Sequence, residues 1–111
     1  MAHSGSGIEH RWGERVRVNI PVLVSAVALS GIDSCIKNIS LSGALIYSAC
    51  DLRLHSLIEV SIELPPPSRR VAVIKAHVSR KLKEGVGIEW CEFAPSIVKD
   101  LLRSPSVRML A

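Results

Sequence analysis

Two arginines near the start of the chain, Arg11 and Arg15, are the first residues whose type and spacing favour binding chemistry. Trp-Gly-Glu separates them, and an alternating apolar segment follows directly. A guanidinium group is planar and permanently charged, and its paired donors fit a phosphate or the O6 and N7 edge of guanine. Gly13 would let the segment bend, so that both groups converge on one anionic ligand. Alone, the pair is equally consistent with a solvated basic arm.

A second polar segment is Asn38-Ile-Ser-Leu-Ser-Gly43. Asn38 and Ser40 lie two residues apart at the end of an expected strand, so we predict that both side chains point to the same side. An amide and a hydroxyl together can read the polar edge of a base. Gly43 would permit close backbone approach or a positive φ. The same residue types also suit a simple turn.

Catalytic motifs are absent from the sequence: it has no phosphate-binding glycine loop, no nucleophile elbow and no zinc-protease motif. Glu59 and Glu63 fall on the outward face of one expected strand and are interpreted as solvated carboxylates. The four histidines do not show metal-ligand spacing. We therefore expect a binding module rather than an enzyme, with no catalytic residues, no metal and no cofactor.

Length and composition predict one domain. The chain has 111 residues, of which 48% are hydrophobic and only 4% aromatic, so its core must consist mainly of Val, Ile, Leu and Ala. A net charge of +4 favours an anionic partner. Three cysteines without a CxxC motif indicate a reducing compartment. With no secretory signal and no apolar run of spanning length, we expect a cytoplasmic protein without membrane insertion.

The elements that must position these residues are mostly strands. Residues 16–28 alternate, with apolar side chains from Val16 to Ala28 on one face, and Pro21 on the other face predicts an edge position or a bulge. A turn is expected at Ser30-Gly31, a hairpin loop at 81–85, and a bulge near Val73 and Ile74. Further strands are predicted over 33–39, 44–47, 57–64, 71–79 and 86–90.

The period changes near Pro95, which suits the first position of a helix. Beyond it, apolar residues recur at helical spacing: Ile97, Val98, Leu101 and Leu102. The order is therefore about six strands followed by one short amphipathic helix. This order fits either a β-sandwich or a β-barrel.

The two polar segments together resemble the signature of the PilZ domain family, RxxxR followed by (D/N)xSxxG. Here 22 residues separate Arg15 from Asn38. The Ile20-Pro21-Val22 step resembles the family's first strand, and residues 36–46 resemble its central block. Gly87-Ile-Glu-Trp90 is similar to its last strand. The resemblance covers about residues 8–103.

The resemblance implies an all-β fold, a six-stranded antiparallel β-barrel with a short C-terminal α-helix. On this reading residues 1–7 form a tail, residues 8–15 an arginine arm, and residues 16–93 the barrel. The helix then covers residues 95–103, and residues 104–111 form a second tail.

The resemblance also implies a function: a receptor for the bacterial second messenger cyclic di-GMP. Arg11 and Arg15 would hold phosphate and guanine, Asn38 and Ser40 would bond a guanine edge, and Gly43 would permit close approach. Many members carry an aromatic residue where this chain has Arg80. The guanidinium plane of Arg80 could stack on guanine in its place, and the residue type is equally consistent with a solvated arginine at a strand end. The expected ligand-binding residues are thus Arg11, Arg15, Asn38, Ser40, Gly43 and Arg80.

Binding is expected to order the arginine arm over the barrel and to signal to a downstream protein partner. The main alternative is a degenerate PilZ-type adapter that binds no nucleotide and works through protein contacts. A barrel that binds single-stranded nucleic acid is a further alternative. It is disfavoured because such proteins use aromatic stacking platforms, and this chain has one Phe, one Tyr and two Trp.

Overall fold

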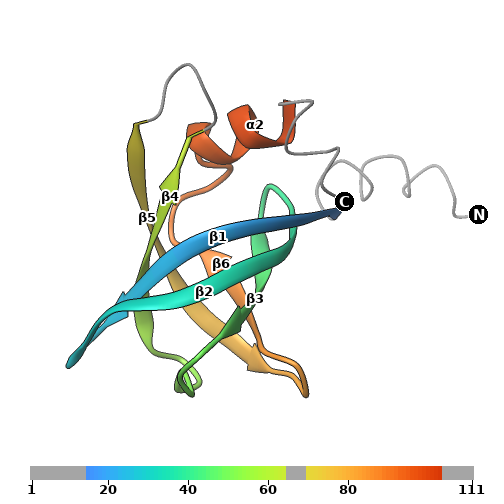
Figure 1. Cartoon of the computed structure of the whole chain (residues 1–111). Helices are drawn as coiled ribbons and strands as arrows, with labels where there is room; N and C mark the ends of the chain where they lie inside the picture. Colours follow the sequence, from blue (N-terminus) through green and yellow to red (C-terminus); the bar gives the residue numbers. More distant parts are fainter. Residues whose placement is uncertain (1–14, 65–69, 104–111) are drawn as a thin grey trace, which may run out of the picture.

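Six antiparallel strands close into a barrel, and one helix follows them (Figure 1). The computed structural model describes residues 15–64 and 70–103. Around the barrel the strands follow the order β1-β2-β3-β6-β5-β4, so that β1 also pairs with β4. The elements are β1 (Val16–Ala26), β2 (Leu29–Ile39), β3 (Gly43–Ser48), β4 (Leu57–Glu63), β5 (Val71–Lys81), β6 (Val86–Trp90) and α2 (Ser96–Arg103).

The predicted alternation of the first strand is confirmed over most of β1. Val18, Ile20, Val22 and Val24 are buried, and the residues between them are exposed. Pro21 is exposed, and β1 pairs with β4 only from Val22 onward, where every residue can donate to the ladder. The β1–β2 register also shifts between Arg17 and Ile20, close to the irregularity that Pro21 predicts.

The turn after β1 lies earlier than the sequence predicts. Val27 and Ala28 form the turn, and Ala28 is exposed with a φ of 67° rather than inward-facing. Gly31, expected in the turn, belongs to β2 with a φ of 61°, and its N–H donates to the Ser25 hydroxyl at 3.1 Å. A second register shift between Val24 and Ala26 accommodates it. Gly31 therefore marks a bulge inside a longer hairpin.

The bulge predicted near Val73 and Ile74 is wrong. The β4–β5 ladder runs without interruption from Leu57↔His77 to Glu63↔Val71. The irregularity in β5 lies between Val78 and Arg80, on the side that pairs with β6. Alternation over a short run of Val and Ile cannot locate a bulge, because both types fit either face of a strand.

The barrel interior is filled mainly by aliphatic side chains, as the composition predicts, together with Trp90. At one end α2 packs Val98 and Leu101 into this core (Figure 1). Pro95 directly precedes α2, and its carbonyl accepts the first helical hydrogen bonds from the N–H groups of Val98 and Lys99.

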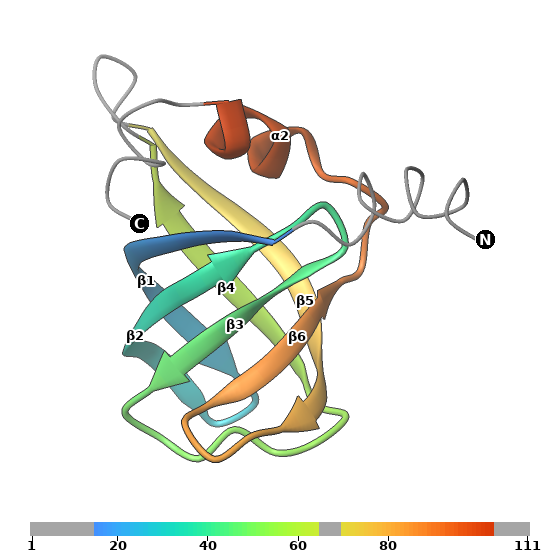
Figure 2. The ribbon, with the colours of Figure 1, turned by 90° about the vertical axis from the view of Figure 1, so that its right-hand side faces the viewer.

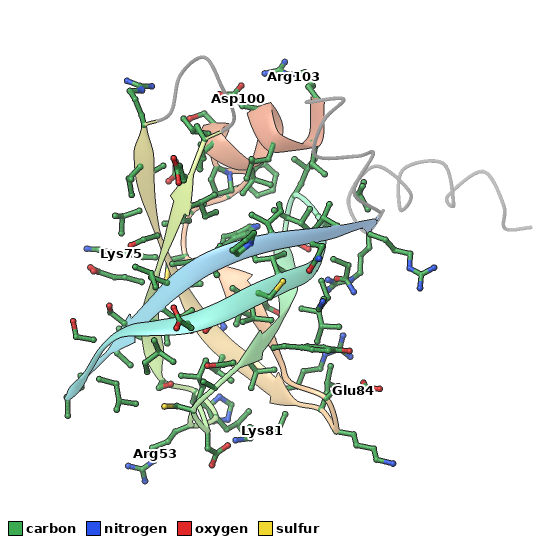
Figure 3. The ribbon with its side chains drawn as sticks, viewed as in Figure 1. Arg53, Lys75, Lys81, Glu84, Asp100 and Arg103 are labelled. Atoms are coloured by element: carbon green, nitrogen blue, oxygen red, sulfur yellow. The ribbon has the colours of Figure 1, made fainter. Side chains whose placement is uncertain are left out.

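At the opposite end, the buried side chain of Leu52 closes the barrel. Leu52 lies in the loop between β3 and β4. Lys81 stabilises this loop by donating to the Leu52 carbonyl at 2.8 Å and by an ion pair with Asp51. Figure 3 shows Lys81, Arg53 and Glu84 together at this end, away from α2. In the part of the chain that the structure describes, no helix is both long and apolar enough to cross a bilayer.

Candidate functional site

Arg15 and Asn38 meet at the start of the barrel. The Arg15 Nη1 donates to the Asn38 Oδ1 at 2.7 Å. Arg15 directly precedes β1, and Asn38 lies near the end of β2. The antiparallel β1–β2 pairing joins them, because it places Val16 opposite Ile39. Two residues of the predicted site that are 23 positions apart in sequence are thus in direct contact.

Arg80 reaches the same region from β5 by way of the sheet register. A cross-strand row runs from Asn38 on β2 through Leu45 and Gly87 to Arg80. These four strands lie side by side on one face of the barrel (Figure 2). Three strand spacings separate the ends of the row, about 14 Å. The Arg80 side chain shortens this gap because it lies against Gly87, where no side chain obstructs it.

The two guanidinium groups affect each other electrostatically. Partial loss of hydration and then the positive charge of Arg80 lower the pKa of Arg15 from its ordinary value. Arginine remains protonated in proteins, so both groups keep their charge at neutral pH. Arg15 is an exposed residue, but its surroundings are unfavourable for positive charge. An anion bound near the two guanidinium groups would therefore be favoured.

A pocket of about 280 Å³ lies beside these arginines. Its lining residues are Arg15, Ser42, Ser79, Arg80, Gly87, Ile88 and Glu89. Arg15 and Arg80 are predicted site residues. The other five were not predicted as ligand-binding residues, although Ser42 lies in the polar segment 38–43. Their shared position depends on the register between β3, β6 and β5, which no local motif encodes.

Ser40 lies deeper than predicted. β2 ends at Ile39, so the alternation that would align Ser40 with Asn38 stops one residue earlier. Ser40 is 0% exposed, and its Oγ accepts from the Gly43 N–H and lies within hydrogen-bond distance of the Gly43 carbonyl, both at 3.3 Å. The carbonyl of Ser40 accepts from the Trp90 indole at 3.1 Å. Ser40 thus fixes the β2–β3 turn to the core, and a direct contact with a base stays a prediction.

Gly43 has a close neighbour in the barrel itself. A β-carbon at this position would lie 2.0 Å from the backbone oxygen of Ile88 on β6. The absence of a side chain therefore allows β3 and β6 to approach each other here. Close approach of a ligand to Gly43 stays a prediction, and the predicted site residue Arg11 lies outside the described residues.

These features define a class of protein: a small closed β-barrel with a pocket on its outer face that two arginines line. A search with protein-family models matches the PilZ domain over residues 9–104, and the chain belongs to the PilZ domain family. A search of curated proteins found no match. Membership in this family implies, in general terms, a binding domain that acts as a receptor or adaptor for cyclic di-GMP.

Proposed function

We propose that this protein is a cyclic di-GMP receptor that binds the dinucleotide over the outer face of β2, β3, β6 and β5. Arg15 and Arg80 supply positive charge for the two phosphates and planar donors for guanine. Asn38 supplies an amide beside them, and Arg11 is assigned the same role as Arg15 from the motif alone. Ser40 and Gly43 hold the turn that carries this surface.

The observation that carries the proposal is that Arg15 and Arg80 line the same pocket and that the charge of Arg80 acts on Arg15. Arg15 is held by Asn38 at 2.7 Å, and its pKa is lowered in part by the charge of Arg80. Holding two cations close together costs free energy in the empty site. An anion bound between them would recover that free energy, which favours a phosphate-containing ligand over a neutral one.

The proposal includes a switch: on binding, the arginine arm orders over the barrel, and the rearranged surface is read by a partner protein in the cytoplasm. Residues 8–14 of the arm lie outside the described residues, so this part rests on the sequence. Arg15, the last residue of the arm, already contacts Asn38. It would therefore guide the preceding residues toward the pocket.

Isothermal titration calorimetry with cyclic di-GMP and cyclic di-AMP, at one salt concentration, tests the proposal. We expect binding of cyclic di-GMP and at least tenfold weaker binding of cyclic di-AMP, because adenine presents an amino donor where guanine presents O6. Equal affinity for both would indicate general attraction of anions. Binding of neither would favour the adapter that works through protein contacts.

A further inference from the structure

Glu89 is the one carboxylate among the residues that line the pocket beside Arg15 and Arg80. It lies on β6 two residues after Gly87, so both face outward on the same side of the barrel, about 7 Å apart along the strand. The Arg80 side chain lies against Gly87. The side chains of Arg80 and Glu89 therefore share one outer surface, and both line the same pocket.

Neither group neutralises the other. Within the described part of the chain, Arg80 forms no ion pair, and the Glu89 carboxylate lies 3.4 Å from the Nε2 of His77. The Glu89 side chain is 60% exposed, so its carboxylate has room for further partners. The pocket thus offers a cationic donor and an anionic acceptor at the same time.

A carboxylate beside a phosphate-binding surface needs a physical reason, because it repels the phosphates. Guanine provides one. Its Watson–Crick edge carries two kinds of donor, the N1–H and the 2-amino group, and a carboxylate accepts both with its two oxygens. Adenine has an acceptor at N1 and no 2-amino group, so the same carboxylate would repel it.

We propose that Arg80 and Glu89 form a guanine subsite, in which the base stacks on the Arg80 guanidinium while Glu89 accepts the N1–H and the 2-amino protons. Glu89 is then a specificity-determining residue. This inference rests on the proposed function. His77, the cross-strand partner of Glu89, holds the carboxylate from the side away from Gly43.

A double-mutant cycle between protein and ligand tests the subsite. Wild type and Glu89→Gln are titrated with cyclic di-GMP and with its inosine analogue, in which hydrogen replaces each 2-amino group. We expect Glu89→Gln to weaken cyclic di-GMP binding about tenfold, the loss of one charge-assisted contact. The preference of wild type for cyclic di-GMP over the inosine analogue should shrink by a similar factor in the variant.

Glu84→Gln is the matched control. It removes the same charge in the β5–β6 turn, at a residue that does not line this pocket, and should leave the preference unchanged. An unchanged preference in Glu89→Gln, or tighter binding of both ligands, would show that Glu89 is only a nearby negative charge. That result would overturn the subsite and leave the proposed function intact. Failure of wild type to bind cyclic di-GMP would instead overturn both.

Discussion

The side chain of Arg80 lies across its cross-strand partner Gly87, with its Cγ and Nε each 3.1 Å from the point where a β-carbon at position 87 would lie. Gly43 also lies in a crowded position, but there the neighbouring atom is the backbone oxygen of Ile88. One glycine makes room for a flexible side chain and the other for a strand. Replacing each with alanine should therefore have different consequences.

Gly87→Ala should weaken cyclic di-GMP binding three- to tenfold, a cost of about 1 kcal/mol, because Arg80 must leave its position over β6. The free energy of unfolding should change by less than about 1 kcal/mol, since a side chain can move aside without moving the backbone. Calorimetry and urea denaturation measure the two effects. Unchanged affinity would show that the resting position of Arg80 is irrelevant to binding.

Gly43→Ala should lower the free energy of unfolding by about 1–3 kcal/mol, because β3 and β6 must separate to accept the new methyl group. Urea denaturation compared with wild type and with Gly87→Ala gives the difference. A Gly43→Ala protein as stable as Gly87→Ala would mean that the close approach of the two strands is easily relaxed.

Ser40→Ala should also lower the free energy of unfolding, by about 1–3 kcal/mol, because the buried turn loses the Oγ that accepts from the Gly43 N–H. Ser42→Ala, at an exposed position of the same turn, is the control and should cost about 0.5 kcal/mol or less. Thermal or urea unfolding followed by circular dichroism measures both variants. Equal costs would contradict the structural role assigned to Ser40.

Arg15→Ala should weaken cyclic di-GMP binding about ten- to a hundredfold, as expected for the loss of a charge-assisted contact of about 1.5–3 kcal/mol. Arg15→Lys should restore only part of the affinity, because lysine keeps the charge but lacks the planar pair of donors. Calorimetry of each variant measures the effect, and the fold should remain intact because the side chain is exposed.

Arg53→Ala is the control for Arg15→Ala, since Arg53 carries the same charge and does not line the pocket; Figure 3 shows it at the end of the barrel away from α2. Arg17 would be a poor control, although it lies outside the sequence motif, because the register places it directly opposite Asn38. A loss with Arg53→Ala as large as that with Arg15→Ala would indicate general electrostatic attraction.

Ordering of the arm is testable by NMR relaxation of residues 8–14 with and without cyclic di-GMP. We expect fast motion in the free protein and restricted motion in the complex, because these residues precede the first core side chain. Arg11→Ala should reduce this restriction. Equal rigidity in both states would remove the switch from the proposal while leaving the binding itself untouched.

Much of the fold could be predicted from local sequence. The alternation around Val22, the apolar run ending at Trp90 and the helical spacing after Pro95 each report burial on one side of an element, and burial governs which residues face the core. The turn at Val27-Ala28 was missed because Ala28 adopts a positive φ without being Gly or Asn. Gly31 gave a misleading signal, since its positive φ serves a bulge within β2.

The candidate site could be predicted only in part. Arg15 and Asn38 were found because a motif carries them, and the structure brings them into contact. Gly87 and Glu89 were missed as site residues because their place depends on which strand pairs with which, and in what register. A local motif cannot encode that information. Ser40 was expected at the surface because the end of β2 could not be located to within one residue.

The pairing of β1 with β4 also limits how this domain can communicate with other proteins. Many small domains recruit a partner by accepting an additional strand along a free sheet edge, where main-chain groups provide affinity. Here every described strand has a neighbour on both sides, although β1 pairs with β4 only over residues 22–25. If a partner protein detects the ligand-bound state, as proposed above, we expect it to recognise mainly side chains, loops or the helix. Such recognition depends on which side chains the surface carries, so related barrels with different surface residues would bind different partners.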